Sequence, residues 1–314
     1  MKLLTFKVGN TVKLGLLCNG EIVDLPKAYA YFQDNMDRMV KNQIFPQDML
    51  SLLEMGDSGI ELARAVEDRV KRNLQKLESV TPKIIFNIEN IELLPPVTVR
   101  KNIICLGLNY ADHAAETNFP IPEYPVFFTK SPTSIVGNDA AILYPDSSDK
   151  IDYEVELAFV FGRKGKNIPE EEAYNYIAGY TILNDVTARD LQRRYSQWFK
   201  GKSLDTFAPM GPWLVTKDEI PDPHNLDMEL RLNGELMQKS NTKNMIFKIP
   251  SLVKHISLDM TVEPGDIVAT GTPAGVGFTR KPPRYLKHGD IIEACIERIG
   301  TLRNTVKKAE GSSE

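Results

Sequence analysis

The sequence has little cysteine and no long apolar segment. Its three cysteines, among 314 residues, are widely spaced, which favours buried free thiols in a reducing compartment over a disulfide framework or a zinc site. No segment approaches the roughly 18 consecutive apolar residues that suggest a membrane helix, and the first residues turn polar too early for a secretory signal. We therefore expect a cytoplasmic protein with no membrane partner.

Concentrated positive charge is also missing. The 38 lysines and arginines are outnumbered by 42 aspartates and glutamates, which gives a net charge of −4. Because proteins bind a phosphate backbone through clustered positive charge, a nucleic-acid partner is not expected. The hydrophobic fraction of 42% is ordinary for a globular protein, and a chain of this length can bury a large core.

The sequence also lacks a nucleotide-binding fingerprint. The glycine-rich segment from Thr270 to Gly277 reads TGTPAGVG. It lacks both the Gly-Lys-Ser/Thr ending of a P-loop and the glycine spacing of a dinucleotide site. Two interpretations stay open at this point: a plain tight turn, or a turn whose backbone N–H groups and Thr272 hydroxyl bind a carboxylate.

Residues 1–96 are expected to form a small α+β domain. Two apolar runs flank Asn19-Gly20, a pattern that predicts a β-hairpin. Helical periodicity extends from Pro46 to about Leu77, and Gly56 and Gly59 are expected to divide it into two helices. The Pro95-Pro96 pair then breaks the pattern and places the domain boundary.

Residues 97–306 are expected to form a larger α+β domain built on a mixed β-sandwich roll. Many short apolar strands with few scattered helices argue against a βαβ array. Strands are predicted near residues 103–106, 126–128, 155–161, 180–183, 213–215, 228–232, 267–269 and 291–296, and helices near 111–117, 170–176, 187–199 and 249–258. The polar tail, residues 307–314, is expected to fray.

Two glutamates interrupt one of the apolar strands. Glu154 and Glu156 are two residues apart, so in a strand both side chains project from the same face. Neighbouring like charges repel, and burial makes it costlier to keep both ionised. A divalent cation would relieve this, because hard ions take carboxylate oxygens. The ordinary alternative is a solvated strand edge.

A third carboxylate strengthens the metal hypothesis. Asp185 ends another apolar run, just before a predicted helix, so it is either a metal ligand at the end of a strand or a simple helix cap. The sequence has no cluster of histidine and cysteine that would compete with this oxygen-rich set, which makes zinc an unlikely occupant. The predicted ion is Mg²⁺ or Mn²⁺.

Two further features carry candidate catalytic groups. His113 and Glu116 are three residues apart in a helix-forming segment, so they share a helix face, and the carboxylate can orient the imidazole as a general base. An ordinary surface pair is the alternative. Lys202 follows an aromatic helix end and could neutralise a substrate carboxylate or a developing enolate, although solvated lysines are far commoner.

Taken together and in order, these segments resemble the fumarylacetoacetate hydrolase family, over about residues 98–305. The resemblance is carried by five motifs: 109–116 (NYADHAAE), 152–157 (DYEVEL), 184–190 (NDVTARD), 201–203 (GKS) and 270–277 (TGTPAGVG). Each motif is modest, but their number and order make coincidence improbable. The overall pattern resembles the bacterial two-domain members of the family.

The resemblance implies a mixed β-sandwich roll that forms a homodimer. It implies one Mg²⁺ or Mn²⁺ ion on Glu154, Glu156 and Asp185, and a His113–Glu116 dyad on a lid over the substrate. It also implies that Lys202 contacts a substrate oxygen or a metal-bound water and that Thr272 contacts the substrate carboxylate. Arg189 and Gln192 are further implied substrate contacts. Some relatives carry arginine where Leu108 stands, so any carboxylate contact made by that arginine is missing in this chain.

The resulting functional hypothesis is a metal-dependent enzyme that acts on a small 2-oxo acid through a stabilised enolate. Hydrolysis of the C–C bond of an acylpyruvate, of the fumarylpyruvate or acetylpyruvate type, is placed first. Oxaloacetate decarboxylation, keto–enol tautomerisation and isomerisation of 2-hydroxyhepta-2,4-diene-1,7-dioate are the enzymatic alternatives, because each needs the same enolate stabilisation. A non-catalytic dimeric metal-binding protein is the alternative outside enzymes.

Overall fold

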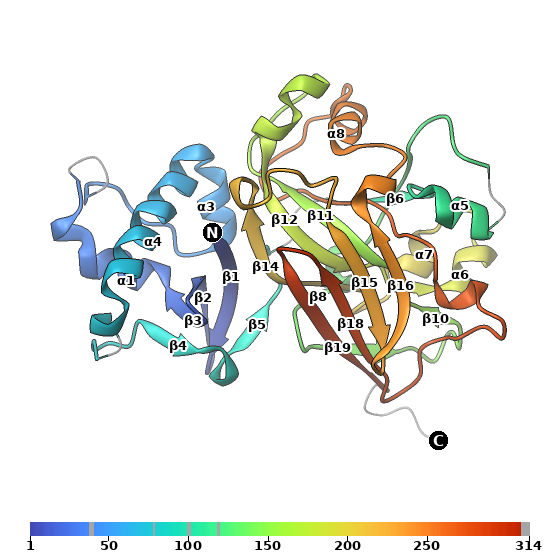
Figure 1. The fold of residues 1–314 in the computed structure, drawn as a ribbon, viewed down its shortest axis with the longest axis horizontal. Helices are drawn as coiled ribbons and strands as arrows, with labels where there is room; N and C mark the ends of the chain where they lie inside the picture. Colours follow the sequence, from blue (N-terminus) through green and yellow to red (C-terminus); the bar gives the residue numbers. More distant parts are fainter. Residues whose placement is uncertain (38–40, 78, 99–101, 118–119, 309–314) are drawn as a thin grey trace.

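The computed structural model describes residues 1–37, 41–77, 79–98, 102–117 and 120–308 (Figure 1). Within these residues, most strands belong to a 12-stranded sheet and a 5-stranded sheet, with helices at the periphery. No helix in this part of the chain is long and apolar enough to cross a bilayer. The predicted α+β class with a mixed β-sandwich roll is confirmed.

The N-terminal part of the chain forms one end of the large sheet. Its strands are β1 (Lys2–Val8), β2 (Thr11–Cys18), β3 (Glu21–Asp24), β4 (Ile85–Asn87) and β5 (Glu92–Leu94). The predicted hairpin joins β2 to β3, and both turn residues have positive φ, 50° at Asn19 and 87° at Gly20. Asn-Gly tolerates this conformation, which matches the twist of the paired strands.

Among the described residues, this end of the sheet is covered by α1 (Leu25–Phe32), α3 (Met49–Glu54) and α4 (Asp57–Leu77). The predicted division of the helical segment is confirmed, because α3 ends before Gly56, which has a φ of 61°. Helix α4 buries the apolar stripe that includes Leu62, Val66 and Val70. Helix α1 was not predicted; Asp24 caps it by accepting a hydrogen bond from the backbone N–H of Lys27.

The large sheet continues without interruption into the second part of the chain. Its order is β4-β3-β2-β1-β14-β12-β11-β17-β6-β7, and β1 pairs antiparallel with β14. These strands are β14 (Ala208–Thr216), β12 (Ile177–Asn184), β11 (Val155–Phe161), β17 (Ile267–Ala269), β6 (Ile103–Gly107) and β7 (Val126–Thr129), while β8 (Ile135–Val136) pairs with β14. The N-terminal residues therefore share a sheet with the residues that carry the candidate site.

The second sheet packs on β11, β12 and β14 (Figure 1). Its order is β16 (Glu235–Asn241), β15 (Asp227–Leu232), β18 (Ile291–Ile296), β19 (Gly300–Lys308) and β9 (Ala141–Tyr144). Every residue of β11 and β12 is buried, so these two strands form the centre of the core. Strand β19 runs through Lys308, and the prediction that the frayed tail begins at residue 307 is wrong for its first two residues. Residues 309–314 lie outside the described part.

The remaining helices lie near the ends of the central strands. They are α5 (Ala111–Thr117), α6 (Arg189–Arg194), α7 (Phe199–Lys202) and α8 (Ile249–Ser257), with short 3-10 segments at Gln33–Asn35, Ile88–Asn90, Pro132–Ser134, Glu170–Tyr176, Lys217–Glu219, Thr242–Asn244 and Gly277–Thr279. The single helix predicted over 187–199 is wrong. Thr187–Ala188 forms β13, which pairs with β10 (Ile151–Asp152), and the chain is extended at Tyr195 between α6 and α7.

Candidate functional site

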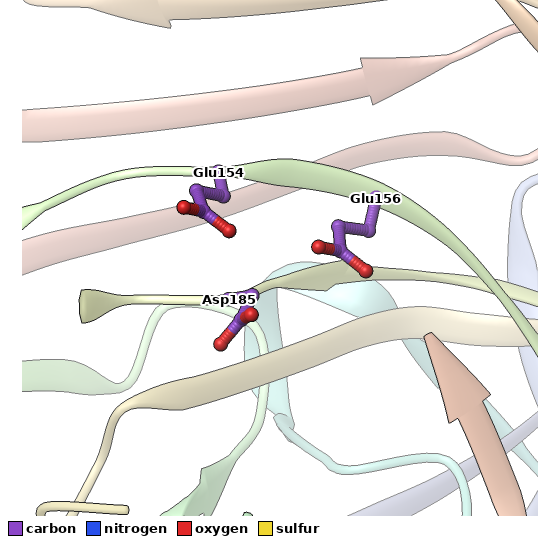
Figure 2. A group of neighbouring side chains, drawn as sticks. All are labelled: Glu154, Glu156 and Asp185. Atoms are coloured by element: carbon purple, nitrogen blue, oxygen red, sulfur yellow. The ribbon is translucent and has the colours of Figure 1, made fainter. Parts of the chain in front are cut away.

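Three carboxylates converge where β11 and β12 run side by side. Glu154 immediately precedes β11, Glu156 is its second residue, and Asp185 follows the end of β12, where its backbone N–H donates to the carbonyl of Glu154 at 2.9 Å. One carboxylate oxygen from each residue lies within 4.8 Å of the others. Figure 2 shows Glu154 and Glu156 projecting from the same side of one segment, with Asp185 on the segment next to it. The predicted convergence of two separate segments is confirmed.

Burial separates this group from a solvated strand edge. Glu154 is 5% exposed, and Glu156 and Asp185 are fully buried. Burial, together with the charges of Asp185 and Glu154, raises the pKa of Glu156 well above its usual range. Burial also acts on Glu154, but the positive charges of Lys202 and Arg189 outweigh it and lower the pKa of Glu154 to about 2. The surrounding side chains therefore stabilise the ionised form of Glu154 but not that of Glu156.

The group fits a divalent cation. One oxygen of Glu156, Oε2, accepts a hydrogen bond from the backbone N–H of Gly271 at 2.8 Å, whereas Oε1 is buried and has no hydrogen-bond partner among the described residues. An unpaired buried carboxylate oxygen is costly. Oxygen ligands at this separation suit a hard ion such as Mg²⁺ or Mn²⁺.

Two buried lysines partly neutralise the carboxylates. The Lys202 ammonium lies 2.9 Å from Glu154 Oε2 and 2.5 Å from Asp185 Oδ2; burial disfavours its charge, but the two carboxylates outweigh burial and raise the pKa of Lys202. Lys130, which the sequence interpretation missed, donates to Asp185 Oδ1 at 2.5 Å and to the carbonyl of Val186 at 3.1 Å. Burial lowers the pKa of Lys130. Its sequence signal was weak: a single lysine after the short strand β7.

Arg189 is held by carboxylates rather than left free. Its Nε donates to Asp152 Oδ2 at 2.8 Å, its Nη1 donates to Gln192 Oε1 at 3.2 Å, and its Nη2 lies 2.6 Å from Glu154 Oε1. Asp152, also missed from sequence, accepts from the backbone N–H of Gly277 at 2.7 Å. The buried Asp152 carboxylate therefore joins the glycine-rich turn to the arginine that contacts Glu154.

His113 and Glu116 of α5 form a hydrogen-bonded pair. His113 Nδ1 lies 2.8 Å from Glu116 Oε1, and the side chains are 10% and 20% exposed. Glu116 also accepts from the backbone N–H of Gly275 and from Thr279 Oγ1, both at 3.0 Å. Burial raises the pKa of Glu116, but the hydrogen bonds from His113, Gly275 and Thr279 outweigh it and lower the pKa. The pair is thus tied to the glycine-rich turn, unlike an ordinary surface pair.

Thr272 lies in the same turn, with its hydroxyl already bonded. Its Oγ1 donates to the carbonyl of Val155 at 2.9 Å and accepts from Gln238 Nε2 at 2.8 Å. The predicted carboxylate contact of Thr272 stays a prediction. The hydroxyl fixes the turn against β11, which helps to place the backbone around the three carboxylates.

A cavity of about 530 Å³ opens onto the group. Its size is typical of a small-molecule site. Five of the six candidate side chains outside the carboxylate triad line it, and so does Glu154, whereas Glu116, Glu156 and Asp185 do not. The lining residues are Leu106, Gly107, Leu108, His113, Thr117, Phe128, Glu154, Arg189, Gln192, Arg193, Tyr195, Ser196, Trp198, Lys202, Thr272 and Phe278.

Comparison with known proteins identifies the family. Residues 102–307 match the family model described as fumarylacetoacetate (FAA) hydrolase C-terminal. The chain belongs to the fumarylacetoacetate hydrolase family. It is 42% identical over 311 residues to "Oxaloacetate tautomerase YisK" of Bacillus subtilis, covering 98% of this chain and 100% of that protein. It is also 42% identical to "Oxaloacetate tautomerase fahd2, mitochondrial" of Xenopus laevis, covering 98% of this chain and 90% of that protein.

The fold agrees with solved members of the fumarylacetoacetate hydrolase family. The structure of a fumarylacetoacetate hydrolase from Exiguobacterium antarcticum superposes with a TM-score of 0.79 at 35% identity, covering 98% of this chain and 100% of that chain. The resemblance drawn from the five sequence motifs is confirmed. The named relatives are enzymes, and they support an enzyme of this family in general rather than a hydrolase in particular.

The buried glutamate predicts a pH dependence of stability for the metal-free protein. Because the pKa of Glu156 is raised above its ordinary value of 4.5, the folded state keeps a proton that the unfolded chain releases. The stability that this proton gives the folded state is fully present below pH 4.5, and it is lost as the pH rises through the folded-state pKa of Glu156. In EDTA, the free energy of unfolding of Glu156→Gln minus that of the wild type should therefore grow as the pH rises above about 4.5.

Urea denaturation of both proteins at several pH values measures this difference, and changes common to both proteins cancel. A difference that stays constant from pH 4 to pH 8 would contradict the raised pKa.

Proposed function

We propose that this protein catalyses the metal-dependent enolisation of a small 2-oxo acid, and that oxaloacetate tautomerisation is the reaction its site supports best. The observation that carries the proposal is the buried Glu154–Glu156–Asp185 group, of which Glu154 lines one cavity together with Lys202 and with His113, the partner of Glu116. The relatives named as oxaloacetate tautomerases over nearly the whole chain support the same reaction.

Each group of the site has a role in moving one proton. In the keto form of oxaloacetate, a C–H bond at C3 breaks, a C2=C3 double bond forms, and the 2-oxo oxygen gains a proton. A Mg²⁺ or Mn²⁺ ion on the three carboxylates would supply Lewis-acid stabilisation of the charge at that oxygen. Lys202 supplies a fixed positive charge beside it. His113, held by Glu116 at Nδ1, is placed to take the C3 proton at Nε2 and return it to oxygen.

Acylpyruvate hydrolysis is the second candidate, favoured by the same oriented histidine. Glu116 fixes one imidazole nitrogen, which leaves the other to remove a proton from water as it attacks the distal carbonyl. Decarboxylation of oxaloacetate needs no such base, because loss of CO₂ leaves the enolate directly. The role of His113 therefore separates the first two reactions from decarboxylation. A homodimer is part of the proposal, as the family resemblance implies.

Substrate profiling tests the proposal. Purified protein with Mg²⁺ or Mn²⁺ is incubated with enol oxaloacetate, acetylpyruvate or fumarylpyruvate, and ultraviolet absorbance follows loss of each conjugated species. A coupled assay follows pyruvate production. We expect EDTA-sensitive tautomerisation of oxaloacetate that exceeds pyruvate formation and acylpyruvate cleavage. Turnover of none of these compounds would favour the non-catalytic metal-binding alternative, and faster acylpyruvate cleavage would favour the hydrolase.

Replacing the histidine should separate chemistry from metal binding. We expect His113→Gln to lower kcat for tautomerisation by about 100- to 10,000-fold, the range for loss of a general base. Its Mg²⁺ affinity by calorimetry should stay within about twofold of the wild type, because His113 is not among the three carboxylate ligands. His255→Gln, in α8, is the matched control and should behave as the wild type. Loss of Mg²⁺ binding in His113→Gln would contradict the assigned role.

A further inference from the structure

One cation at the cavity is not used by the site described above. Four lining residues carry or can carry positive charge. His113 is paired with Glu116, Arg189 with Asp152 and Glu154, and Lys202 with Glu154 and Asp185. Among the described residues, the fourth cation, Arg193, has no carboxylate partner and instead contacts the ring of Phe278.

Helix geometry places this arginine one turn from Arg189, which contacts the carboxylate group. Arg189 and Arg193 are four residues apart on α6, so they lie on the same helix face one turn apart. Both guanidinium groups contact the ring of Phe278, at 4.4 Å and 5.3 Å from the ring centroid. Arg189 contacts the candidate metal ligand Glu154 at 2.6 Å. One aromatic ring therefore links Arg193 to the residues around the carboxylate group.

The chemistry of an unpaired, stacked guanidinium suits a carboxylate. The ring of Phe278 contacts one face of the Arg193 guanidinium through a cation–π interaction. The N–H edge of the guanidinium can bind both oxygens of a carboxylate. Tyr195 and Ser196, which follow Arg193 closely in the chain, also line the cavity. By contrast, the apolar lining residues Leu106, Leu108, Phe128 and Trp198 offer no charge to a second anionic group.

We propose that Arg193 binds the far carboxylate of a dianionic 2-oxo acid and so selects dicarboxylates over monocarboxylates. The inference rests on the proposed function, since it assumes that the other end of the substrate lies at the Glu154–Glu156–Asp185 group. It names the substrate class of that site: short-chain 2-oxo dicarboxylic acids such as oxaloacetate, as opposed to 2-oxo acids with an uncharged tail.

Comparing the reactions of two substrates tests the contact between Arg193 and the far carboxylate. Enolisation of oxaloacetate is compared with enolisation of 2-oxobutanoate, followed by deuterium exchange at C3, because the two share the reacting end and differ in the far carboxylate. Arg193→Gln should raise KM for oxaloacetate by about 10-fold or more, the effect of losing a hydrogen bond to a charged group, with kcat and the 2-oxobutanoate reaction within about twofold. Arg194→Gln, next on the same helix and outside the lining residues, is the matched control.

Binding of unreactive analogues gives a readout that does not need turnover. Malate and lactate share a 2-hydroxy carboxylate, and only malate has a second carboxylate. Calorimetry with Mg²⁺ present should show that the wild type and Arg194→Gln bind malate more tightly than lactate, and that Arg193→Gln loses most of this preference while Arg193→Lys keeps part of it.

The outcomes distinguish the inference from the function on which it rests. If the wild type prefers malate through Arg193 but turns over neither 2-oxo acid, the proposed function fails and the carboxylate contact stands. If the wild type binds malate no more tightly than lactate, or if Arg193→Gln weakens both ligands or both reactions equally, the inference is overturned.

Discussion

Replacing Glu156 with glutamine is expected to abolish metal-dependent turnover while leaving the metal-free fold intact. The substitution keeps the shape of the side chain and its hydrogen bond from the Gly271 N–H, but it removes one of three anionic ligands. Even loss of a group that only supports a metal ligand costs 10- to 100-fold in affinity or activity. We therefore expect Mg²⁺ affinity to fall by at least about 100-fold and kcat to fall below detection.

Measurements on the metal-free protein separate loss of metal binding from loss of the fold. Glu156 is crowded by Asp185 and Glu154, which raise its pKa together with burial, so a neutral amide relieves repulsion and should not lower the melting temperature in EDTA. Glu235→Gln, at the exposed first residue of β16, is the matched control for loss of one negative charge. Circular dichroism, calorimetry and the tautomerisation assay measure fold, metal affinity and turnover. A Glu156→Gln protein with full, EDTA-resistant activity would exclude a metal at this group.

Replacing Lys202 with methionine is expected to have the largest effect on stability. The Lys202 ammonium is 3% exposed and pairs with both Glu154 and Asp185. Its removal leaves two buried carboxylates without that partner, and breaking a buried pair in this way costs about 3–5 kcal/mol. The free energy of unfolding in EDTA should fall by about that amount, and kcat should fall by about 100- to 1000-fold because a fixed positive charge is lost beside the enolate oxygen.

Added metal should partly rescue this variant. A divalent cation bound to the same carboxylates replaces the lost positive charge, so Mg²⁺ should raise the melting temperature of Lys202→Met more than that of the wild type. Lys200→Met, an exposed lysine two residues away on α7, should show neither the loss nor the rescue. Equal melting temperatures of Lys202→Met and the wild type in EDTA would show that the buried ion pairs do not stabilise the fold.

Local sequence patterns were sufficient for the parts of the site that depend on short-range geometry. The alternation of side chains in a strand placed Glu154 and Glu156 on one face, and helical spacing placed His113 and Glu116 together. Asp185 was predicted because it ends an apolar run. The Asn19-Gly20 hairpin and the division at Gly56 were predicted for the same reason: the conformations that these residues favour are set by their nearest neighbours in the chain.

The parts that were missed depend on contacts between distant segments. Lys130 reaches Asp185, 55 residues further along the chain, and Asp152 reaches Gly277 across 125 residues. No periodic pattern in the sequence predicts such contacts, because they are set by strand order and by the packing of one loop against another. The helix predicted over 187–199 failed similarly, since pairing of β13 with β10 competes with helical propensity at Thr187.

By itself, the sequence determined the family, the strand and helix content of the main elements, and which three acidic residues form the candidate metal site, because each is encoded by residue type and short spacing. Only the tertiary structure decided that these acids are buried, that two lysines and Arg189 partly offset their charge, and that β1 joins both parts of the chain into one sheet through β14. The reason is physical: burial and charge pairing depend on which segments the fold brings together, and spacing along the chain does not specify that.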